Sequence, residues 1–505
     1  MAGTAHIIRE ILNSTGAIIP ETVIALMIPF ILLADLFIFR KQKFFFTIIM
    51  LFGLAVTSWF LFVEAGWAGG EKYTGAFSGM IRIDGIALVF KILFVLSGFL
   101  FVFLSLVESK PGKFHSEAEY FIIFLGILLG AMLMVMSSSL MMVYISIELV
   151  SLSSYMLSVF NFDRKSVESG LKYILFGAVS SAFMLYGISL LYGFTGTLNI
   201  FSGEFIDKII AVPPFPAFMA LMMIFSGLLF KMAVVPFHIW TPDVYEGAPV
   251  SLIAFFSIVP KLAGLVIFGR LFYLLNSLPG NIEWVTVFGF LAIITMFIGN
   301  LAALRQNDPK RMMAYSSIAH SGYLMVGIIA MNILGLQSVA IHAFVYLVMN
   351  FLVFLIIEIL TPPRGPASIP EYSGWFRHVP VLAVLLLVGF ISLTGLPPTG
   401  GFTSKMMLFS SAWYSYAEGE NKIMLWLIIL GLLNTVISLF YYLRIPYYMI
   451  FREATNAPIQ VPPQRNGFIG LGIFLAALII IVFIKPDWLA DMLNSLNFTY
   501  PEITE

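Results

Sequence analysis

Glu148 is a carboxyl group in the middle of an apolar run long enough to cross a membrane. Tyr144, Ser151 and Tyr155 lie at helical spacing from it, so the four side chains share one face of a helix. A charged side chain at the centre of a transmembrane helix costs roughly 2.5–3.5 kcal/mol on insertion scales, and such residues usually mark a pathway or relay. We therefore expect Glu148 to face other helices or internal water and to take part in proton transfer. A static structural ion pair is the alternative.

Two lysines, Lys231 and Lys405, lie in apolar runs that proline interrupts. Pro236 follows Lys231 by five residues, and a Pro/Gly cluster at 395–401 precedes Lys405. Proline removes a backbone donor and clashes with the carbonyl four residues earlier, so both helices should be broken. Paired interrupted spans in the two halves of a transporter point to an ion site. Their positions predict two inverted five-helix repeats, roughly 119–276 and 284–450.

Lys261, His320 and His342 supply further groups that can carry protons between these lysines. Lys261 follows Pro260 near the middle of an apolar run, with Ser257 about one turn before it. Both histidines lie on polar stripes of consecutive runs. A single histidine in such a run is as often a packing residue as a relay. Polar stripes on neighbouring runs, however, predict a hydrated lateral chain of proton sites rather than one pore.

Four other basic residues lie within apolar runs but closer to their ends, namely Lys91, Lys172, Arg270 and Arg444. The two arginines can extend to the membrane interface. Lys91 is two turns from Asp84, and Lys172 is close to Glu168. From the residues alone, a structural role is as open for all four as a functional one.

These residues must be positioned by membrane helices, because the composition excludes a soluble protein. Charged residues make up 11% of the 505 residues and hydrophobic residues 60%, whereas about a quarter of an ordinary soluble chain is charged. We expect an all-α membrane protein with one polytopic domain over 1–505, N-terminal helices at 17–107 and a last helix at 466–486. Runs of spanning length predict about fourteen transmembrane helices, with thirteen or fifteen as alternatives, near 17–39, 44–63, 85–107, 119–137, 138–160, 167–193, 216–238, 250–276, 284–304, 311–331, 333–360, 379–410, 423–450 and 466–486.

The basic residues predict an orientation. Fourteen lie in connections after odd-numbered runs, against six on the opposite side. By the positive-inside rule, the odd connections are cytoplasmic and both termini are on the outer side. Met1 to Ser14 has no apolar core, so the first run is expected to remain as a membrane helix. We expect a multi-pass protein of the bacterial plasma membrane.

Several functions are excluded. The formal net charge is zero, so no basic face indicates nucleic acid binding. The chain has no cysteine, which excludes thiolate-held iron–sulfur clusters and a cysteine nucleophile. The longest predicted connections are about twenty residues, too short for a nucleotide-binding fold. No cofactor or metal is therefore expected in this chain, and its chemistry should take place inside the membrane.

Four motifs resemble the antiporter-like membrane subunits of respiratory complex I. Residues 236–249, Pro-Phe-His-Ile-Trp-Thr-Pro-Asp-Val-Tyr-Glu-Gly-Ala-Pro, are similar to the subunit called N in bacteria, B in the cyanobacterial and chloroplast enzyme, and to its mitochondrial counterpart. The other three are Ile145-Ser-Ile-Glu148-Leu with Ser153-Ser-Tyr155, Lys310-Arg-Met-Met-Ala-Tyr-Ser-Ser-Ile-Ala-His320, and Gly395-Leu-Pro-Pro-Thr-Gly-Gly-Phe402. Together they extend over roughly residues 80–450, most of the chain.

The resemblance implies roles for the residues above. It implies fourteen helices in two inverted five-helix units, with broken seventh and twelfth helices. Glu148 and Lys231 would form a coupled pair, Lys261 the central relay and Lys405 the distal lysine. Lys172 falls at a family position that is basic, which favours a functional role. The sister subunit called M has Glu at the last site, so a lysine there fits the N type.

The resemblance also implies a function, a proton-translocating membrane subunit of an NADH or ferredoxin:quinone oxidoreductase. NAD(P)H or ferredoxin, flavin, iron–sulfur clusters and quinone would then belong to partner subunits. The expected partners are a sister antiporter-like subunit, small helical subunits, the lateral helix of the largest sister subunit, and the lipid bilayer. A multisubunit cation/proton antiporter is the alternative, and a scaffold whose buried charges merely fix helix packing is a third reading.

Overall fold

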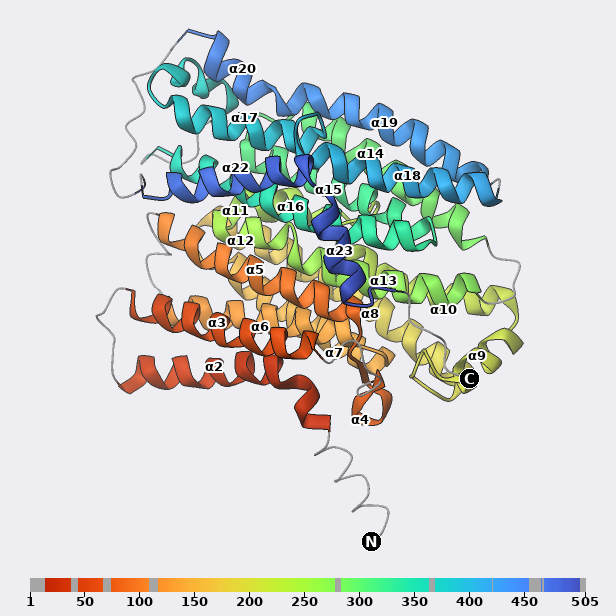
Figure 1. Ribbon diagram of the computed structural model, residues 1–505. Helices are drawn as coiled ribbons and strands as arrows, with labels where there is room; N and C mark the ends of the chain where they lie inside the picture. The colour runs from red at the N-terminus through yellow and green to blue at the C-terminus, as the bar shows by residue number, and fades with distance from the viewer. Residues whose placement is uncertain are drawn as a thin grey trace.

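The computed structural model describes residues 14–37, 44–66, 74–108, 117–277, 283–362, 368–419, 421–453, 465 and 467–499. In these ranges the chain is helical almost throughout, apart from one small antiparallel ribbon of β1 (Thr74–Gly75) and β2 (Ile81–Arg82). The long helices run side by side in one bundle (Figure 1). The predicted all-α fold is confirmed.

The N-terminal part of the bundle contains η1 (Thr15–Ile18), α2 (Ile19–Phe37), α3 (Phe45–Ala65), α4 (Ala76–Gly79) and α5 (Gly85–Val107). The elements that follow are α6 (Glu117–Met136), α7 (Leu140–Ser158), α8 (Arg164–Thr195), α9 (Gly203–Ala211), α10 (Pro214–Met232), α11 (Trp240–Gly247), α12 (Val250–Phe256) and α13 (Val259–Ser277). The last part contains α14 (Trp284–Leu304), α15 (Pro309–Ile329), α16 (Ile333–Ile359), η3 (Ile369–Tyr372), η4 (Trp375–Arg377), α17 (Pro380–Thr394), α18 (Gly400–Gly419), α19 (Lys422–Tyr442), α20 (Arg444–Phe451), α22 (Ile469–Ile484) and α23 (Asp487–Ser495).

The chain is a multi-pass membrane protein. Across the described ranges, 12 helices are long and apolar enough to cross a membrane, or 13 if α22 and α23, bent by 85° relative to each other, form one span. The predicted span at 379–410 is divided into α17 and α18, and the one at 466–486 contains the 16-residue α22. A count of fourteen spans is therefore not confirmed. The inverted repeats stay a prediction.

The orientation also stays a prediction. Both chain termini lie outside the described residues. So do many of the basic residues on which the prediction depends, namely Arg9, Arg40, Lys41, Lys43, Lys72, Lys110, Lys113 and Arg364.

The predicted break near Pro236 is present. α10 ends at Met232, and Ala233 adopts the left-handed conformation with φ 56°. The next helix, α11, begins at Trp240, so the proline lies in a non-helical connection. At membrane depth, freed backbone groups need partners inside the protein. Here the amide of Val235 donates to Thr295 Oγ1 at 3.2 Å.

The predicted break before Lys405 is also present. α17 ends at Thr394, and Gly395 has φ 87°, a left-handed conformation that glycine adopts without steric cost. α18 begins at Gly400. At Gly401 the two helices approach so closely that a Cβ would lie 1.8 Å from the carbonyl oxygen of Ser392.

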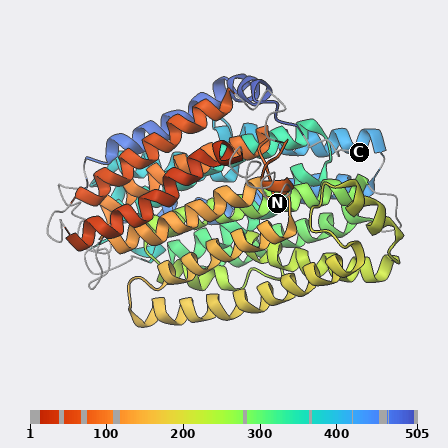
Figure 2. The ribbon, with the colours of Figure 1, turned by 90° about the horizontal axis from the view of Figure 1, so that it is seen from below.

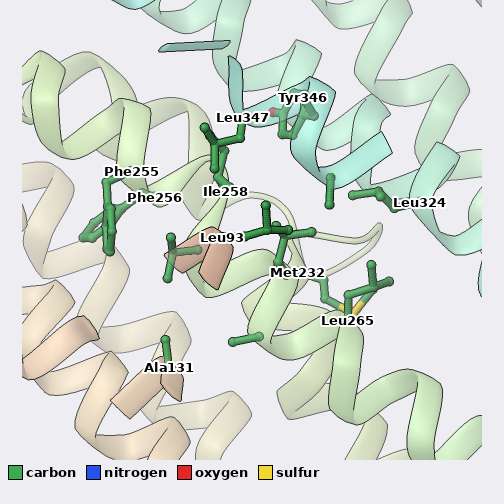
Figure 3. Packing of buried hydrophobic residues seen from close by; sticks show 14 of the residues in the cluster. Leu93, Ala131, Met232, Phe255, Phe256, Ile258, Leu265, Leu324, Tyr346 and Leu347 are labelled. Carbon is green, nitrogen blue, oxygen red and sulfur yellow. The ribbon is translucent and has the colours of Figure 1, made fainter. Parts of the chain in front are cut away.

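The centre of the bundle is formed by α12, α13, α15 and α16. The most apolar stretch of Val250–Asn276 is 100% buried and those of α15 and α16 are 94% buried, against 33% for α8. In Figure 2, α8 lies along the outer edge. Figure 3 shows Met232 of α10, Ile258 of the connection between α12 and α13, and Leu324 of α15 in the same packed apolar region. Ionisable side chains on the central helices are therefore enclosed by protein rather than lipid.

Candidate functional site

Glu148 lies on α7 and faces α8. Its carboxylate accepts a hydrogen bond from the hydroxyl of Ser181 on α8. The same hydroxyl oxygen lies 3.4 Å from Tyr144 Oη, so Tyr144 and Glu148 share one face of α7 as their spacing predicts. Glu148 is half-buried. It therefore lies at the edge of the ionisable groups described below.

Lys231 is buried in the last turn of α10. Its ammonium donates to Ser151 Oγ at 2.9 Å. Ser151 follows Glu148 by about one helical turn, so the lysine reaches the helix that carries the carboxyl. Among the described contacts there is no direct Glu148–Lys231 ion pair: the ammonium contacts Ser151 and the carboxylate contacts Ser181. The C-terminal end of a helix is partly negative, which favours a cation at this position.

Lys261 lies on α13, just after the short interruption between α12 and α13. Its ammonium donates to Ser317 Oγ of α15 at 2.8 Å. That hydroxyl lies 3.2 Å from Tyr245 Oη of α11. One turn further along α15, Ser321 donates to the carbonyl of Met232, the last residue of α10, at 2.6 Å. α15 therefore connects the end of α10 to Lys261.

His320 of α15 and His342 of α16 form a hydrogen-bonded pair. His320 Nδ1 is 3.2 Å from His342 Nε2, and His342 Nδ1 is 2.9 Å from Ser404 Oγ of α18. On the other side, Tyr442 Oη lies 3.3 Å from His320 Nε2 and also contacts Ser316. A neutral imidazole has one donor and one acceptor nitrogen. The pair can therefore pass a proton from one side to the other.

Lys405 directly follows Ser404 on α18 and is buried. Its ammonium donates to the carbonyls of Leu393 and Thr394, both at 2.9 Å. These carbonyls end α17, where the break leaves them without helical partners. The ammonium also lies 4.4 Å from the centre of the Tyr323 ring, a cation–π contact. The break thus supplies the acceptors that hold this lysine.

Lys172 lies apart from this series, near the N-terminal end of α8, with 42% of its side chain exposed. Its ammonium is 3.0 Å from Glu168 and 2.9 Å from Asp243. Arg311 of α15 joins the same network, 3.1 Å from Asp243 and 2.6 Å from Glu246. The network surrounds a polar cavity of about 200 Å³. Its ion pairs link the N-terminal ends of α8 and α15 to α11.

The contacts of Arg270 and Arg444 favour a structural role for both residues. Arg270 is buried, and its guanidinium lies 2.7 Å from the carboxylate of Asp84, the partly exposed residue that caps the start of α5. Arg444 donates to the carbonyls of Leu304 and Gln306 at 3.0 and 2.8 Å, at the end of α14. Both arginines therefore hold helix ends in place.

Lys91 does not pair with Asp84, its neighbour in sequence. It binds Glu21 and Glu64 instead, on two other helices. Among the residues the structure describes, no group of three His, Asp or Glu side chains is placed to hold a metal ion.

Sequence reasoning missed Ser181, Ser404, Glu21 and Glu64. Ser404 had a local signal, since it stands next to Lys405. Ser181 had none, because single serines are common in apolar runs and its partner lies 33 residues away.

Interrupted membrane helices that gather lysines, histidines and a carboxyl inside an apolar bundle define a proton- or ion-handling membrane protein. Residues 137–438 match the family described as NADH:quinone oxidoreductase/Mrp antiporter, TM. The curated relative NADH-quinone oxidoreductase subunit N of Chlorobium chlorochromatii is 35% identical over 470 residues, which cover 91% of this chain and 89% of the relative. The chain belongs to this family.

Two solved structures resemble the whole bundle. A chain of respiratory complex I from Thermus thermophilus is 27% identical, with a TM-score of 0.75 over 92% of this chain and 98% of that one. A chain of the membrane-bound sulfane sulfur reductase, an archaeal respiratory membrane complex, is 25% identical, with a TM-score of 0.83 over 97% and 98%. The likeness therefore includes the N-terminal helices that the matched family segment leaves out.

Proposed function

We propose that this chain is a proton-translocating membrane subunit of an NADH:quinone oxidoreductase, driven by redox chemistry on partner subunits. One observation supports this most: inside the apolar bundle, Lys231, Lys261, the histidine pair and Lys405 follow one another on packed helices, held by hydroxyl and carbonyl groups. Flavin, iron–sulfur clusters, quinone and the electron donor belong to the partners in this proposal.

The lysines are arranged to exchange protons rather than to keep them. In the described part of the chain, the polar contacts of Lys231, Lys261 and Lys405 are with neutral groups, not with carboxylates. A buried ammonium without a carboxylate partner is costly. Each lysine therefore lacks a fixed carboxylate counter-ion and can exchange its proton when water or a hydroxyl bridges to the next group.

Glu148 acts as the switch at one end of the series. When its carboxylate approaches Lys231, the opposite charge favours the protonated lysine. When it turns away, toward Ser181, that support is lost and the proton moves toward Lys261. The non-helical connection after α10 gives the Lys231 segment freedom to shift. In this proposal Ser151, which contacts the ammonium, bridges the two groups.

Two inverted five-helix repeats, 119–276 and 284–450, each carry one broken helix and one of the two terminal lysines. Lys172, through its ion pair with Asp243, sets the position of α11, the helix that follows the first break. The partners are a sister antiporter-like subunit, small helical subunits and the lateral helix of the largest subunit. The protein lies in the bacterial plasma membrane with both termini on the outer side.

The test is Lys231→Ala, with complex content measured on native gels and proton uptake measured in inverted membrane vesicles. We expect assembled complex with strongly reduced proton uptake. Lys208→Ala is the matched control, because Lys208 is an exposed lysine paired with Glu204 on α9. Normal uptake in assembled Lys231→Ala complex would reject the role of this lysine. Loss of assembly before loss of uptake would favour the scaffold reading.

A cation/proton antiporter is the second candidate, since the matched family includes Mrp antiporters. The sequence motif Asp243-Val-Tyr-Glu-Gly247 favours the oxidoreductase subunit over the antiporter. Its two carboxylates bind Lys172 and Arg311. Purification of the complex from its native membrane decides between them. Hydrophilic flavin and iron–sulfur subunits in the preparation support the oxidoreductase. Membrane chains alone, with cation-dependent proton movement, support the antiporter.

A further inference from the structure

A second group of buried charges lies outside the series above. This Lys91 cluster consists of Lys91 on α5, Glu21 on α2 and Glu64 on α3. The ammonium is 2.7 and 2.9 Å from the two Glu64 oxygens and 3.0 Å from Glu21 Oε1. The side chains of Lys91, Glu21 and Glu64 are 0%, 2% and 3% exposed. Two carboxyl groups therefore share one ammonium in a site closed to water.

The helices around the Lys91 cluster bring no second cation to it. α2, α3, α5 and α6 pack against one another here (Figure 1). Their other charged residues are Asp35, Glu117 and Glu119, all acidic and all near the opposite helix ends. α6 contributes Met136, whose sulfur is 3.3 Å from the ammonium. Both Glu21 oxygens are buried without an aligned hydrogen-bond donor among the described residues.

Within the described residues, the two arginines close to this end of α5 contact Asp84. Arg270 holds Asp84 through two contacts of 2.7 and 2.8 Å, and it donates to the carbonyl of Val135, next to Met136. Arg82 lies 3.9 Å from the same aspartate, at a partly exposed position. Both arginines therefore contact Asp84, whereas Glu21 and Glu64 contact Lys91.

From this arrangement we infer that the Lys91 cluster is a proton-binding site, in which Glu21 and Glu64 share one proton while Lys91 stays charged. Two ionised carboxylates at one ammonium would leave a net negative charge in a dry interior, which is costly. Two carboxyl groups that share a site avoid this when one of them keeps its proton. The proton comes from water, and binding it converts one carboxylate into a carboxylic acid. The cluster is then neutral.

The bound proton affects how the N-terminal helices are attached. α2 and α3 each carry one carboxyl of the cluster, and α5 carries the lysine that holds both. Loss of the proton would set two negative charges against each other across α2 and α3. The site therefore links the packing of these helices on α5 to the uptake of one proton. This inference does not rest on the proposed function of the central lysines.

Difference infrared spectroscopy of the purified complex tests the proton directly. Glu21→Gln and Glu64→Gln should each remove one carboxylic acid C=O band from the wild-type spectrum. In either variant the remaining carboxyl becomes the ionised partner of Lys91. Glu204→Gln is the matched control, because Glu204 is an exposed carboxylate paired with Lys208, and it should remove no such band.

Assembly supplies the second measurement. Glutamine resembles a protonated carboxyl, so each single variant should assemble like the wild type, measured on native gels. Lys91→Met, which leaves the carboxyls without their cation, should lower the assembled complex by at least about tenfold. The double variant Glu21→Gln/Glu64→Gln, which leaves Lys91 without a counter-ion, should also assemble poorly. If no carboxylic acid band is lost, or if both single variants assemble as poorly as Lys91→Met, both carboxyls are ionised and the inference is wrong.

Discussion

Replacing Gly395 by alanine is expected to disturb the Lys405 site more than it destabilises the fold. Gly395 ends α17 with φ 87°, and a Cβ there would lie 2.8 Å from Lys405 Cδ. The lysine side chain must move away from that methyl group. Its ammonium now donates to the carbonyls of Leu393 and Thr394, each at 2.9 Å. The substitution should therefore weaken or break at least one of these bonds.

The size of the effect follows from two contributions. A non-glycine residue in the left-handed conformation costs about 1–2 kcal/mol, which lowers the stability of the chain. Loss of one hydrogen bond to a charged group costs about 1.5–3 kcal/mol, which is a ten- to hundredfold change in an equilibrium constant. We expect the second contribution to fall on the proton equilibrium of Lys405. Proton uptake per assembled complex should fall by about tenfold or more.

Gly196→Ala is the matched control. Gly196 ends α8 with φ 70°, and its nearest side chain is the exposed Lys208, 3.4 Å from where a Cβ would lie. This variant carries the same backbone cost at a glycine remote from Lys405. Both variants are compared by proton uptake in inverted vesicles, divided by complex content on native gels. If Gly395→Ala keeps the same normalised uptake as Gly196→Ala, the two carbonyls do not matter to the function of Lys405.

Three further results are expected. Glu148→Gln should leave complex content unchanged but lower normalised proton uptake by at least about 100-fold, the lower end of the usual contribution of one proton-transferring side chain. Gly401→Ala should reduce assembled complex on native gels, because its Cβ would lie 1.8 Å from Ser392 O and such overpacking costs about 1–3 kcal/mol or more. Burial raises the pKa of Glu246, but its two basic neighbours, Arg311 foremost, outweigh this and lower it below its usual value. The stability from Glu246 is thus complete above its usual pKa and is lost as pH falls through the lowered value, so the thermal destabilisation by Glu246→Gln should shrink in acid.

One result for each variant would contradict its prediction. Normal uptake with Glu148→Gln would leave the switch without support. Gly419→Ala, at a glycine with open space around it, is the control for Gly401→Ala, and equal assembly of the two would show that α17 and α18 tolerate separation. A thermal effect of Glu246→Gln that does not change with pH would mean that the ion network is not what that carboxyl contributes.

The two helix breaks were predictable because they follow from local backbone constraints. Pro236 cannot continue a helix, and the Pro/Gly cluster before Lys405 cannot form one. The same local reasoning identified the buried lysines Lys231, Lys261 and Lys405, since a charge near the middle of an apolar run is expected to be enclosed by protein. It also placed the break that separates α17 from α18 at Gly395, within the predicted span 379–410, but it did not fix the number of spans.

The partners of these lysines were not predictable from local sequence. Lys231 meets a serine 80 residues away, and Lys405 meets backbone carbonyls, which no side-chain pattern shows. Lys91 has Asp84 two turns away in sequence, yet it binds Glu64, 27 residues distant, and Glu21 on another helix. These contacts depend on how the helices pack against one another, and local patterns in a single sequence do not reveal that packing.

Proton uptake by complex that contains Lys261→Gln tests the central claim most directly, because Lys261 comes between the two helix breaks along the chain and joins α13 to α15 through Ser317. Lys310→Gln is the matched control, since Lys310 is a buried lysine that donates to the carbonyl of Ala248. We predict that the Lys261 variant assembles and loses proton uptake, while the control keeps it. Unchanged uptake in assembled Lys261→Gln complex would contradict a proton path through this lysine.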